Sequence, residues 1–217
     1  AGLAGLSDTM TELSVFADRC LKWSLSVLFQ HQCEEFGTPK KSDESIQQLV
    51  IIGMGKLGAR ELNFSSDIDL IFAYPDTGTA SGRPKSVSGE EFFVRLCRKL
   101  VNVISETTLD GIVFRVDLDL RPFGKSGPIV MSFDAMEDYY QRQGREWERY
   151  AWIKARVVAD GNGEGVRFLK KMKPFVYRRY LDFATFESFR DMKRRIEVEV
   201  KRKGMKNDIK LGPGGIR

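Results

Sequence analysis

The sequence has 217 residues, of which 42% are hydrophobic and 30% charged, and its 35 basic residues outnumber its 30 acidic ones. This size and composition indicate a globular protein with a sizeable core, and no apolar run approaches the roughly 20 residues that span a membrane. The net charge of +5 favours acidic partners such as phosphates or an acidic protein. Since no aromatic–basic signature of RNA binding is present, neither a nucleic acid nor a membrane is expected as a partner.

Further expectations follow from the cysteines, the single histidine and the two ends of the sequence. Cys20, Cys33 and Cys97 lack the spacing of a metal site and leave one odd thiol, which favours the reducing cytoplasm. The lone histidine, His31, offers no basis for histidine-based catalysis. The sequence has no initiator methionine and closes on a glycine-rich turn at residues 211–217, so we expect a fragment of a longer protein.

A long helix is expected over residues 7–36, where apolar residues recur at three- and four-residue steps. The recurring residues are Leu13, Phe16, Cys20, Trp23 and Val27. Gly37 and Pro39 end this helix, and a polar linker follows at residues 40–45. We interpret residues 1–45 as a helical lead-in to a catalytic core at 46–160.

A short apolar strand at residues 49–52 runs into the glycine motif GMGKLG at residues 53–58. A strand followed by G-x-G-x-x-G is typical of dinucleotide-binding (Rossmann) domains, and Asp76 follows Gly53 by 23 residues. Against this, residues 56–66 leave at most about two helical turns before the next strand. A Rossmann-type NAD(P)-binding enzyme remains an alternative, as does a tight turn whose glycines serve only the backbone.

Two carboxylates, Asp67 and Asp69, stand at the start of the next predicted strand, residues 68–74. Residues two apart on a strand share a face, so these carboxylates project together while Ile68 and Leu70 enter the core. Carboxylates that close repel each other, and a divalent cation between them removes that cost. Their hard oxygen atoms suit Mg²⁺ or Mn²⁺. A surface strand with two solvated aspartates is the plain alternative.

The third predicted strand, residues 112–121, alternates between apolar and charged side chains. Its charged face carries Arg115, Asp117, Asp119 and Arg121. Such a face is costly unless the charges are solvated, paired or bound to an ion. Two Arg–Asp pairs on an edge strand would explain the pattern; so would a third carboxylate, Asp117, beside the first two. A basic turn follows at residues 121–127, where Arg121, Lys125 and backbone amides offer a phosphate site.

The remaining predicted elements are helical. Ser88 and Glu91 form a capping box that begins a helix, and further helices are expected over residues 137–158 and 174–203, with a glycine-rich loop at 160–165 between them. Residues 161–217 are interpreted as a helical extension of the catalytic core.

This order of elements is that of a nucleotidyltransferase. Transfer of an adenylyl group requires neutralising a polyphosphate and activating an oxygen nucleophile, which two metal ions held by three carboxylates accomplish. A glycine turn before a helix lets backbone amides approach the phosphates.

At this level of detail the sequence resembles the bacterial glutamine synthetase adenylyltransferase/adenylyl-removing enzymes of the DNA polymerase β-like nucleotidyltransferase superfamily. The resemblance covers roughly residues 46–217. Its runs are GMGKLG (53–58), ELN (61–63), SSDIDL (65–70), FRVD (114–117), LRPFG (120–124), WERYA (147–151) and IKLGPGGIR (209–217).

The resemblance implies an α+β, polymerase β-like fold with a small mixed sheet and helical additions at both ends. It also implies a site in which Asp67, Asp69 and Asp117 bind Mg²⁺ or Mn²⁺. The residues placed at the nucleotide and phosphate are Gly55, Lys56, Ser66, Arg121 and Lys125. Lys56 stands where many superfamily members have Ser, and Asp119 departs from the family, which often has a basic or neutral residue there.

Proteins of this family carry two such domains, one that adenylylates a tyrosine of glutamine synthetase with ATP and one that removes the AMP with inorganic phosphate, releasing ADP. The run at residues 143–156 looks more like the adenylyl-removing domain. The implied partners are glutamine synthetase, the PII signalling protein and a second nucleotidyltransferase domain. The alternatives are the adenylylating direction and a domain that only docks glutamine synthetase or PII.

Overall fold

The structure is a computed structural model that describes residues 5–82 and 85–177, with isolated positions between 187 and 202. The chain divides into two compact units, Ala1–Val176 and Tyr177–Arg217, and the elements below belong to the first. More than half of the helix predicted over residues 174–203 lies outside the described residues, as does all of the closing run 209–217. The domain boundaries at residues 45 and 160 stay predictions.

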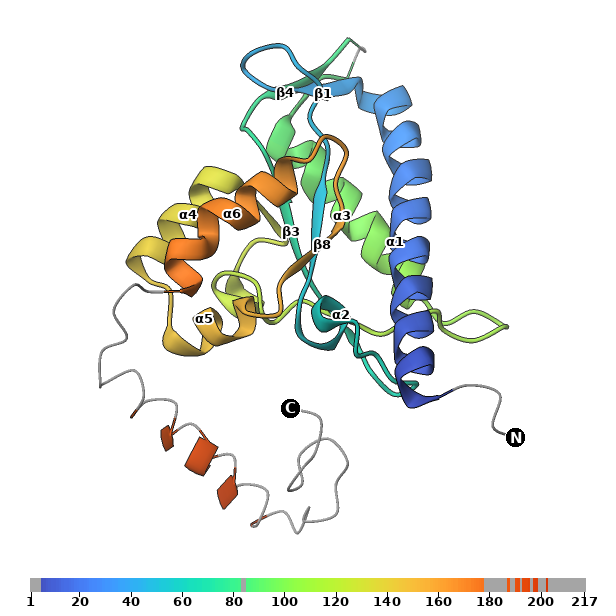
Figure 1. The fold of residues 1–217 in the computed structure, drawn as a ribbon. Coiled ribbons are helices and arrows are strands. Elements are labelled where there is room, and N and C mark those ends of the chain that lie inside the picture. Colours follow the sequence, from blue (N-terminus) through green and yellow to red (C-terminus); the bar gives the residue numbers. More distant parts are fainter. Residues whose placement is uncertain are drawn as a thin grey trace. The chain divides into compact units, whose positions relative to one another are not determined.

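A five-stranded sheet forms the centre of this unit (Figure 1). Its middle strands, β2 (Val50–Gly53) and β3 (Ile68–Tyr74), are antiparallel, and β8 (Arg156–Ala159) pairs antiparallel with the other edge of β2. Two short strands run parallel to β3, β6 (Val116–Asp117) at its start and β7 (Val130–Ser132) at its end. This mixed sheet with helices confirms the α+β class, and it is consistent with a nucleotidyltransferase-like fold.

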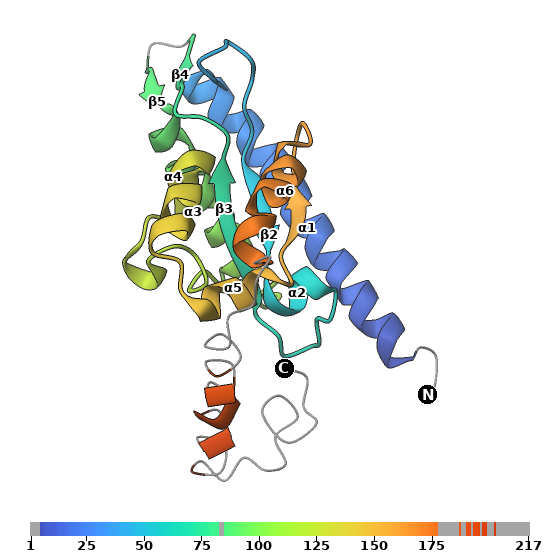
Figure 2. The same ribbon diagram turned by 60° about the vertical axis from the view of Figure 1, so that its left-hand side comes forward.

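Helices cover both faces of the sheet, which explains why β2 is apolar throughout. On one face lie α1 (Leu6–Phe36) and α3 (Gly89–Ser105), which pack with Ile51, Leu70 and Phe72. On the other lie α4 (Phe133–Arg142), α5 (Glu146–Trp152) and α6 (Glu164–Val176), which pack with Val50 and Ile52. Figure 1 shows the sheet between these two groups of helices, and Figure 2 shows α6 in front of β2. Among the described residues no helix is long and apolar enough to cross a membrane.

The long first helix is confirmed, but its buried face is not the one that its apolar pattern predicts. Phe16, Trp23 and Val27 are exposed, Trp23 by 73%. The helix instead buries mostly small and polar residues: Ser14, Ala17, Asp18, Leu21, Ser24, Gln32 and Phe36. Small side chains allow close contact with α3, and the Gln32 amide donates a hydrogen bond to the carbonyl of Phe92 on that helix.

The single helix predicted over residues 137–158 is wrong, because the chain forms α4, α5 and β8 there. The break falls at Gly144, where a Cβ would lie 2.5 Å from the Tyr140 carbonyl oxygen and 2.6 Å from the Phe175 ring. The α5 helix then begins with the Glu148 carboxylate accepting a hydrogen bond from the Arg145 amide, 2.8 Å away. The break lets residues 156–159 return to the sheet as β8.

Several short strands fall where the sequence predicts a linker or loop. A second sheet joins β1 (Thr38–Lys40), β4 (Thr79–Ser81) and β5 (Val87–Ser88). The predicted helix start is confirmed: the Ser88 hydroxyl accepts a hydrogen bond from the Glu91 amide at the beginning of α3. The strand predicted over residues 112–121 is paired only at β6, although its alternate residues Phe114 and Val116 do pack against the core.

The Rossmann alternative is not supported. A dinucleotide-binding unit needs two parallel strands joined by a crossover helix, whereas β2 and β3 are antiparallel. The helix between them, α2 (Gly55–Ala59), has only five residues. Asp76, the candidate ribose-binding residue, instead accepts hydrogen bonds from the amide and hydroxyl of Ser42.

Candidate active site

The three predicted carboxylates come from two neighbouring parallel strands. Asp69 on β3 and Asp117 on β6 are direct partners in the strand register, one step after the pair Ile68 and Val116. Asp67 immediately precedes β3, and by the alternation of strand residues it belongs to the face of Asp69. The parallel pairing of β3 and β6 therefore brings together carboxylates that lie about 50 residues apart in the sequence.

The glycine turn before α2 lies against one of these carboxylates. The Met54 amide donates to the Asp69 carbonyl at 2.9 Å, which holds the turn beside β3. Gly55 has a φ of +51°, and a Cβ on it would lie 2.5 Å from Oδ2 of Asp69. Glycine is required here for both the backbone conformation and the space beside the carboxylate.

Ser66 and Lys56 belong to one cluster next to the carboxylates. The Ser66 hydroxyl donates to Oδ1 of Asn63 at 2.7 Å and accepts from the Asn63 amide at 3.2 Å. The ammonium group of Lys56 lies 3.3 Å from the same hydroxyl. The structure thus places Lys56, on α2, beside the loop that leads into Asp67.

Asp67 forms an ion pair with Arg115, a residue of the charged face that was not among the predicted site residues. Arg115, which precedes β6, places its Nε 2.5 Å from Oδ1 of Asp67, and its terminal nitrogen donates to the Ser65 carbonyl at 2.7 Å. The ion pair is open to solvent, with 61% of the arginine side chain and 42% of the aspartate side chain exposed. The sequence signal for this contact was that Arg115 lies two residues before Asp117, on the same face of the predicted strand.

Asp117 and Asp119 have different partners. Oδ1 of Asp117 accepts a hydrogen bond from the Asp119 amide at 2.7 Å. The Asp119 carboxylate lies 3.4 Å from the ammonium group of Lys125. Asp119 therefore pairs with Lys125, rather than with Arg121 as one interpretation of the sequence proposed.

Arg121 fastens the basic turn. Its guanidinium donates to the carbonyls of Leu118, Lys125 and Gly127 at 2.8–3.3 Å, across the single 3₁₀ turn η1 (Gly124–Ser126). The Lys125 side chain is 84% exposed. A phosphate contact by Arg121 or Lys125 stays a prediction, and the geometry assigns Arg121 at least the task of shaping the turn that carries Lys125.

A divalent cation fits the chemistry of this face, although the carboxylates do not converge on one point. Within the described part of the chain, no group of three or more His, Cys, Asp or Glu side chains is placed to hold a metal ion. The reason lies partly in Asp67, whose Oδ1 is directed to Arg115. The donors are nevertheless hard carboxylate oxygens, and Gly55 gives the Asp69 carboxylate the room against the turn that a Cβ would take. Asp67, Asp69 and Asp117 are the residues that would hold the ion.

Three charged residues within the run at 143–156 have structural partners. Glu148 is buried and accepts a hydrogen bond from the Tyr139 hydroxyl at 2.7 Å. Lys154 pairs with Glu61 at 2.7 Å. Arg156 donates to both carboxylate oxygens of Asp18 and to the carbonyls at the end of α2. Arg156 thereby ties α1 to the helix that follows the glycine turn.

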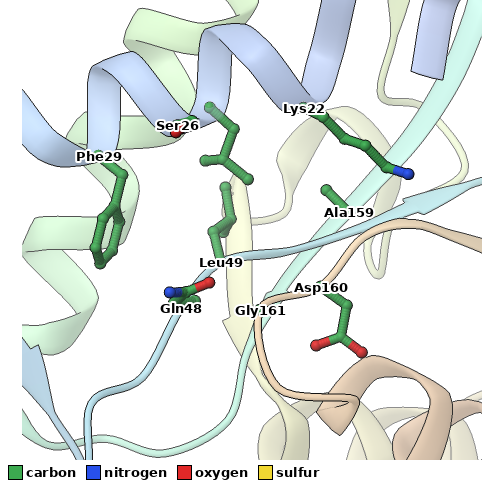
Figure 3. A pocket seen from close by; sticks show the side chains of 9 residues that line it. Lys22, Ser26, Phe29, Gln48, Leu49, Ala159, Asp160 and Gly161 are labelled. Carbon is green, nitrogen blue, oxygen red and sulfur yellow. The ribbon is translucent and has the colours of Figure 1, made fainter. Parts of the chain in front are cut away.

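Two cavities lie elsewhere on this unit and are lined by none of the three carboxylates. One, of about 380 Å³, lies between α1 and the end of β8; Figure 3 shows Lys22 and Phe29 on one side of it and Asp160 on the other. The other, of about 440 Å³, includes Lys41 and Arg167.

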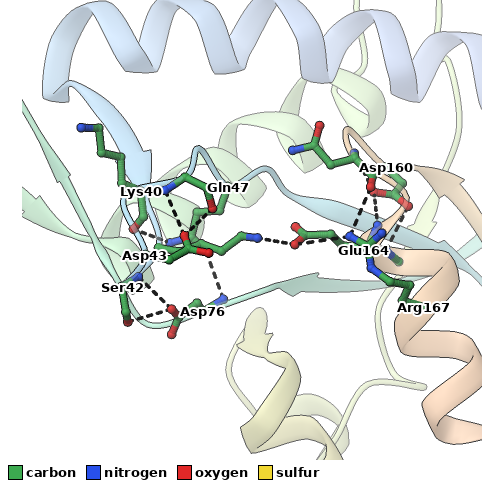
Figure 4. A network of polar contacts seen from close by, with 12 residues as sticks. Lys40, Ser42, Asp43, Gln47, Asp76, Asp160, Glu164 and Arg167 are labelled. Carbon is green, nitrogen blue, oxygen red and sulfur yellow. Dashed lines mark hydrogen bonds and ion pairs between the residues drawn. The ribbon is translucent and has the colours of Figure 1, made fainter.

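Charged groups that line the two cavities form internal contacts. Lys41 pairs with Glu164, and Asp160 accepts hydrogen bonds from backbone amides at the start of α6 (Figure 4). The Lys41–Glu164 pair fastens the loop between β1 and β2 to α6.

Comparison with known proteins finds the family that this chain resembles. Residues 1–171 match the family model described as glutamate-ammonia ligase adenylyltransferase. Proteins of Nitrosococcus oceani and Pseudomonas aeruginosa, each named bifunctional glutamine synthetase adenylyltransferase/adenylyl-removing enzyme, are 55% identical to the chain. A protein of the same name from Shewanella loihica is 48% identical. These matches cover 99–100% of the chain, which spans only 22–23% of the length of these relatives.

Proposed function

Since the chain belongs to the glutamate-ammonia ligase adenylyltransferase family, we propose that it removes AMP from the adenylylated tyrosine of glutamine synthetase. The reaction is a metal-dependent phosphorolysis that releases ADP. The observation that carries this proposal is the register of Asp69 with Asp117 on adjacent parallel strands, with the Gly55 turn against Asp69. That arrangement would set two carboxylate ligands side by side, with the backbone of the glycine turn against one of them.

The residues of the site suit a reaction between two phosphates. A divalent cation held by Asp67, Asp69 and Asp117 would neutralise the charge of phosphate oxygens. The glycine turn at the start of α2 would offer backbone amides to the nucleotide phosphate, and the ammonium group of Lys56, on α2, lies near Ser66. A phosphate oxygen then forms a bond to the adenylyl phosphorus, and the bond to the tyrosine oxygen breaks. The electron pair stays on the tyrosine oxygen, which takes up a proton, and ADP leaves.

The direction of transfer rests on resemblance, because the names of the relatives include both activities. The run at residues 143–156 favours the adenylyl-removing direction. In the structure this run forms α5 and the turn into β8, which places Lys154 against Glu61 and Arg156 against α2. The PII protein and a second nucleotidyltransferase domain remain proposed partners on the same ground.

The test is ADP release from adenylylated glutamine synthetase in the presence of Mg²⁺ and inorganic phosphate. Asp69→Asn is the informative variant, because it changes the charge of one ligand with almost no change in shape. Asp138→Asn is the matched control: Asp138 lies on α4, is 55% exposed and pairs with Arg142. We expect ADP release to be abolished by the first substitution and unchanged by the second.

A parallel reaction with unmodified glutamine synthetase and labelled ATP tests the opposite direction. Incorporation of label without phosphate-dependent ADP release would mean that the chain adenylylates its substrate, and the proposed direction would be wrong. Equal ADP release by Asp69→Asn and the parent would contradict the assignment of the carboxylates.

A further inference from the structure

Arg115 is the residue of the site that the proposed chemistry leaves without a task. It contacts Asp67 just before the point where the parallel strands β3 and β6 pair Ile68 with Val116 and Asp69 with Asp117. The face therefore carries three carboxylates and one guanidinium. The guanidinium contacts Oδ1 of Asp67, a carboxylate oxygen that a bound cation would also need.

The contacts of Arg115 explain the arrangement of the carboxylates. Its Nε is 2.5 Å from Oδ1 of Asp67, and the same carboxylates form no group able to hold a metal among the described residues. A guanidinium stays charged at every pH at which proteins are folded. It is therefore a cationic competitor for that oxygen.

The ion pair between Arg115 and Asp67 can open readily, so that each residue can take another partner. Both side chains are largely exposed, and ion pairs in contact with water are weak because solvent screens the charges. A divalent cation carries twice the charge of the guanidinium and interacts with Asp69 and Asp117 as well. The contact between Arg115 and the Ser65 carbonyl, 2.7 Å, holds the loop before β3 while the arginine is in place.

We propose that Arg115 is a positioning residue that competes with the divalent cation for Asp67, so that it lowers the metal affinity of the site and leaves Asp67 when the metal binds. This inference rests on the proposed function for the identity of the metal site. In the absence of metal, Arg115 neutralises the charge of Asp67. It also sets the metal concentration at which the site is loaded.

The direction in which the Mn²⁺ affinity changes when Arg115 is replaced separates this role from a merely structural one. Mn²⁺ alone is titrated into the full chain, without nucleotide or protein substrate, and free Mn²⁺ is followed by electron spin resonance. Arg115→Gln should bind Mn²⁺ about fivefold more tightly than the parent, which corresponds to about 1 kcal/mol. A residue that only supported the loop would, on removal, weaken binding.

The matched control is Arg95→Gln, which removes the same charge from an exposed ion pair with Glu91 on α3. It should leave Mn²⁺ affinity unchanged. Arg115→Lys keeps the charge but loses the planar fork of donors, and its affinity should lie between those of the parent and Arg115→Gln. Thermal melting of each variant verifies folding, and if Arg115→Gln fails to fold, the lysine variant decides.

Equal or weaker Mn²⁺ binding by a folded Arg115 variant would overturn the inference. Asp67→Asn, titrated in the same way, distinguishes this failure from failure of the proposed function. Weaker binding by Asp67→Asn with no effect of Arg115→Gln would overturn only the competition. Unchanged binding by both Asp67→Asn and Asp69→Asn would overturn the metal site and the competition together.

Discussion

Replacement of Gly55 by alanine is the substitution whose effect the geometry defines most closely. The new Cβ would lie 2.5 Å from Oδ2 of Asp69, whereas real Cβ contacts are essentially never shorter than 3.0 Å. The carboxylate must therefore retreat by about half an ångström, which is the tolerance within which reacting groups are held. The positive φ adds a backbone cost of roughly 1–2 kcal/mol for any residue other than glycine.

Gly163→Ala separates these two costs. Gly163 has a φ of +72°, similar in sign to that of Gly55, but its nearest atom beyond the adjoining residues would be 3.8 Å from an added Cβ. Both variants should lose roughly 1–2 kcal/mol of unfolding free energy in urea. Only Gly55→Ala should also lose affinity for Mn²⁺ and, by displacing Asp69, about a hundredfold in turnover.

The measurements are urea unfolding, Mn²⁺ titration and phosphate-dependent ADP release, made on the two variants in parallel. If Gly55→Ala retained the Mn²⁺ affinity and turnover of Gly163→Ala, the space beside Asp69 would be unimportant, and the account of the glycine turn would be refuted.

Three other consequences concern stability and reactivity. Hydrogen bonds from the amide and hydroxyl of Ser42 lower the pKa of Asp76 below its usual 3.8, so its contribution to stability is present above that value and is lost as the pH falls through the lower pKa of the folded state. Asp76→Asn should therefore flatten the loss of stability below about pH 4 in acid denaturation, and an unchanged slope would contradict this. Burial raises the pKa of the Cys97 thiol well above its usual value, so a thiol reagent at about pH 8 should label it only after unfolding; labelling at the rate of the other two cysteines would be contrary evidence. Glu148→Ala should cost about 2 kcal/mol in urea unfolding, because the Tyr139 hydroxyl and a backbone amide lose their buried acceptor, and a cost near zero would show that water replaces the carboxylate.

The centre of the fold follows from local sequence signals. The strand β3 has the boundaries that its apolar run predicts, and the glycine turn falls directly before α2 as the motif indicates. These segments carry their own information: a buried strand must be apolar, and a turn with positive φ beside a carboxylate must be glycine. The same signals identified Asp69 and Asp117 before the register placed them together.

Other features depend on contacts that no local pattern encodes. The break between α4 and α5 depends on the Phe175 ring, which lies 31 residues beyond Gly144 and leaves no room for a side chain there. The buried face of α1 is set by close packing on α3, and its apolar residues Phe16 and Trp23 remain at the surface. Arg115 was placed on the charged face by alternation, but its pairing with Asp67 follows only from the register of β3 with β6.

The most direct test of the account is a crystal structure of the chain with Mn²⁺, in which anomalous scattering locates the metal. The account predicts a peak within bonding distance of the carboxylates of Asp69 and Asp117, with the Arg115 guanidinium withdrawn from Asp67. At saturating Mn²⁺, a peak elsewhere or the absence of a peak at these two carboxylates would contradict the metal site. The proposed phosphorolysis depends on that site.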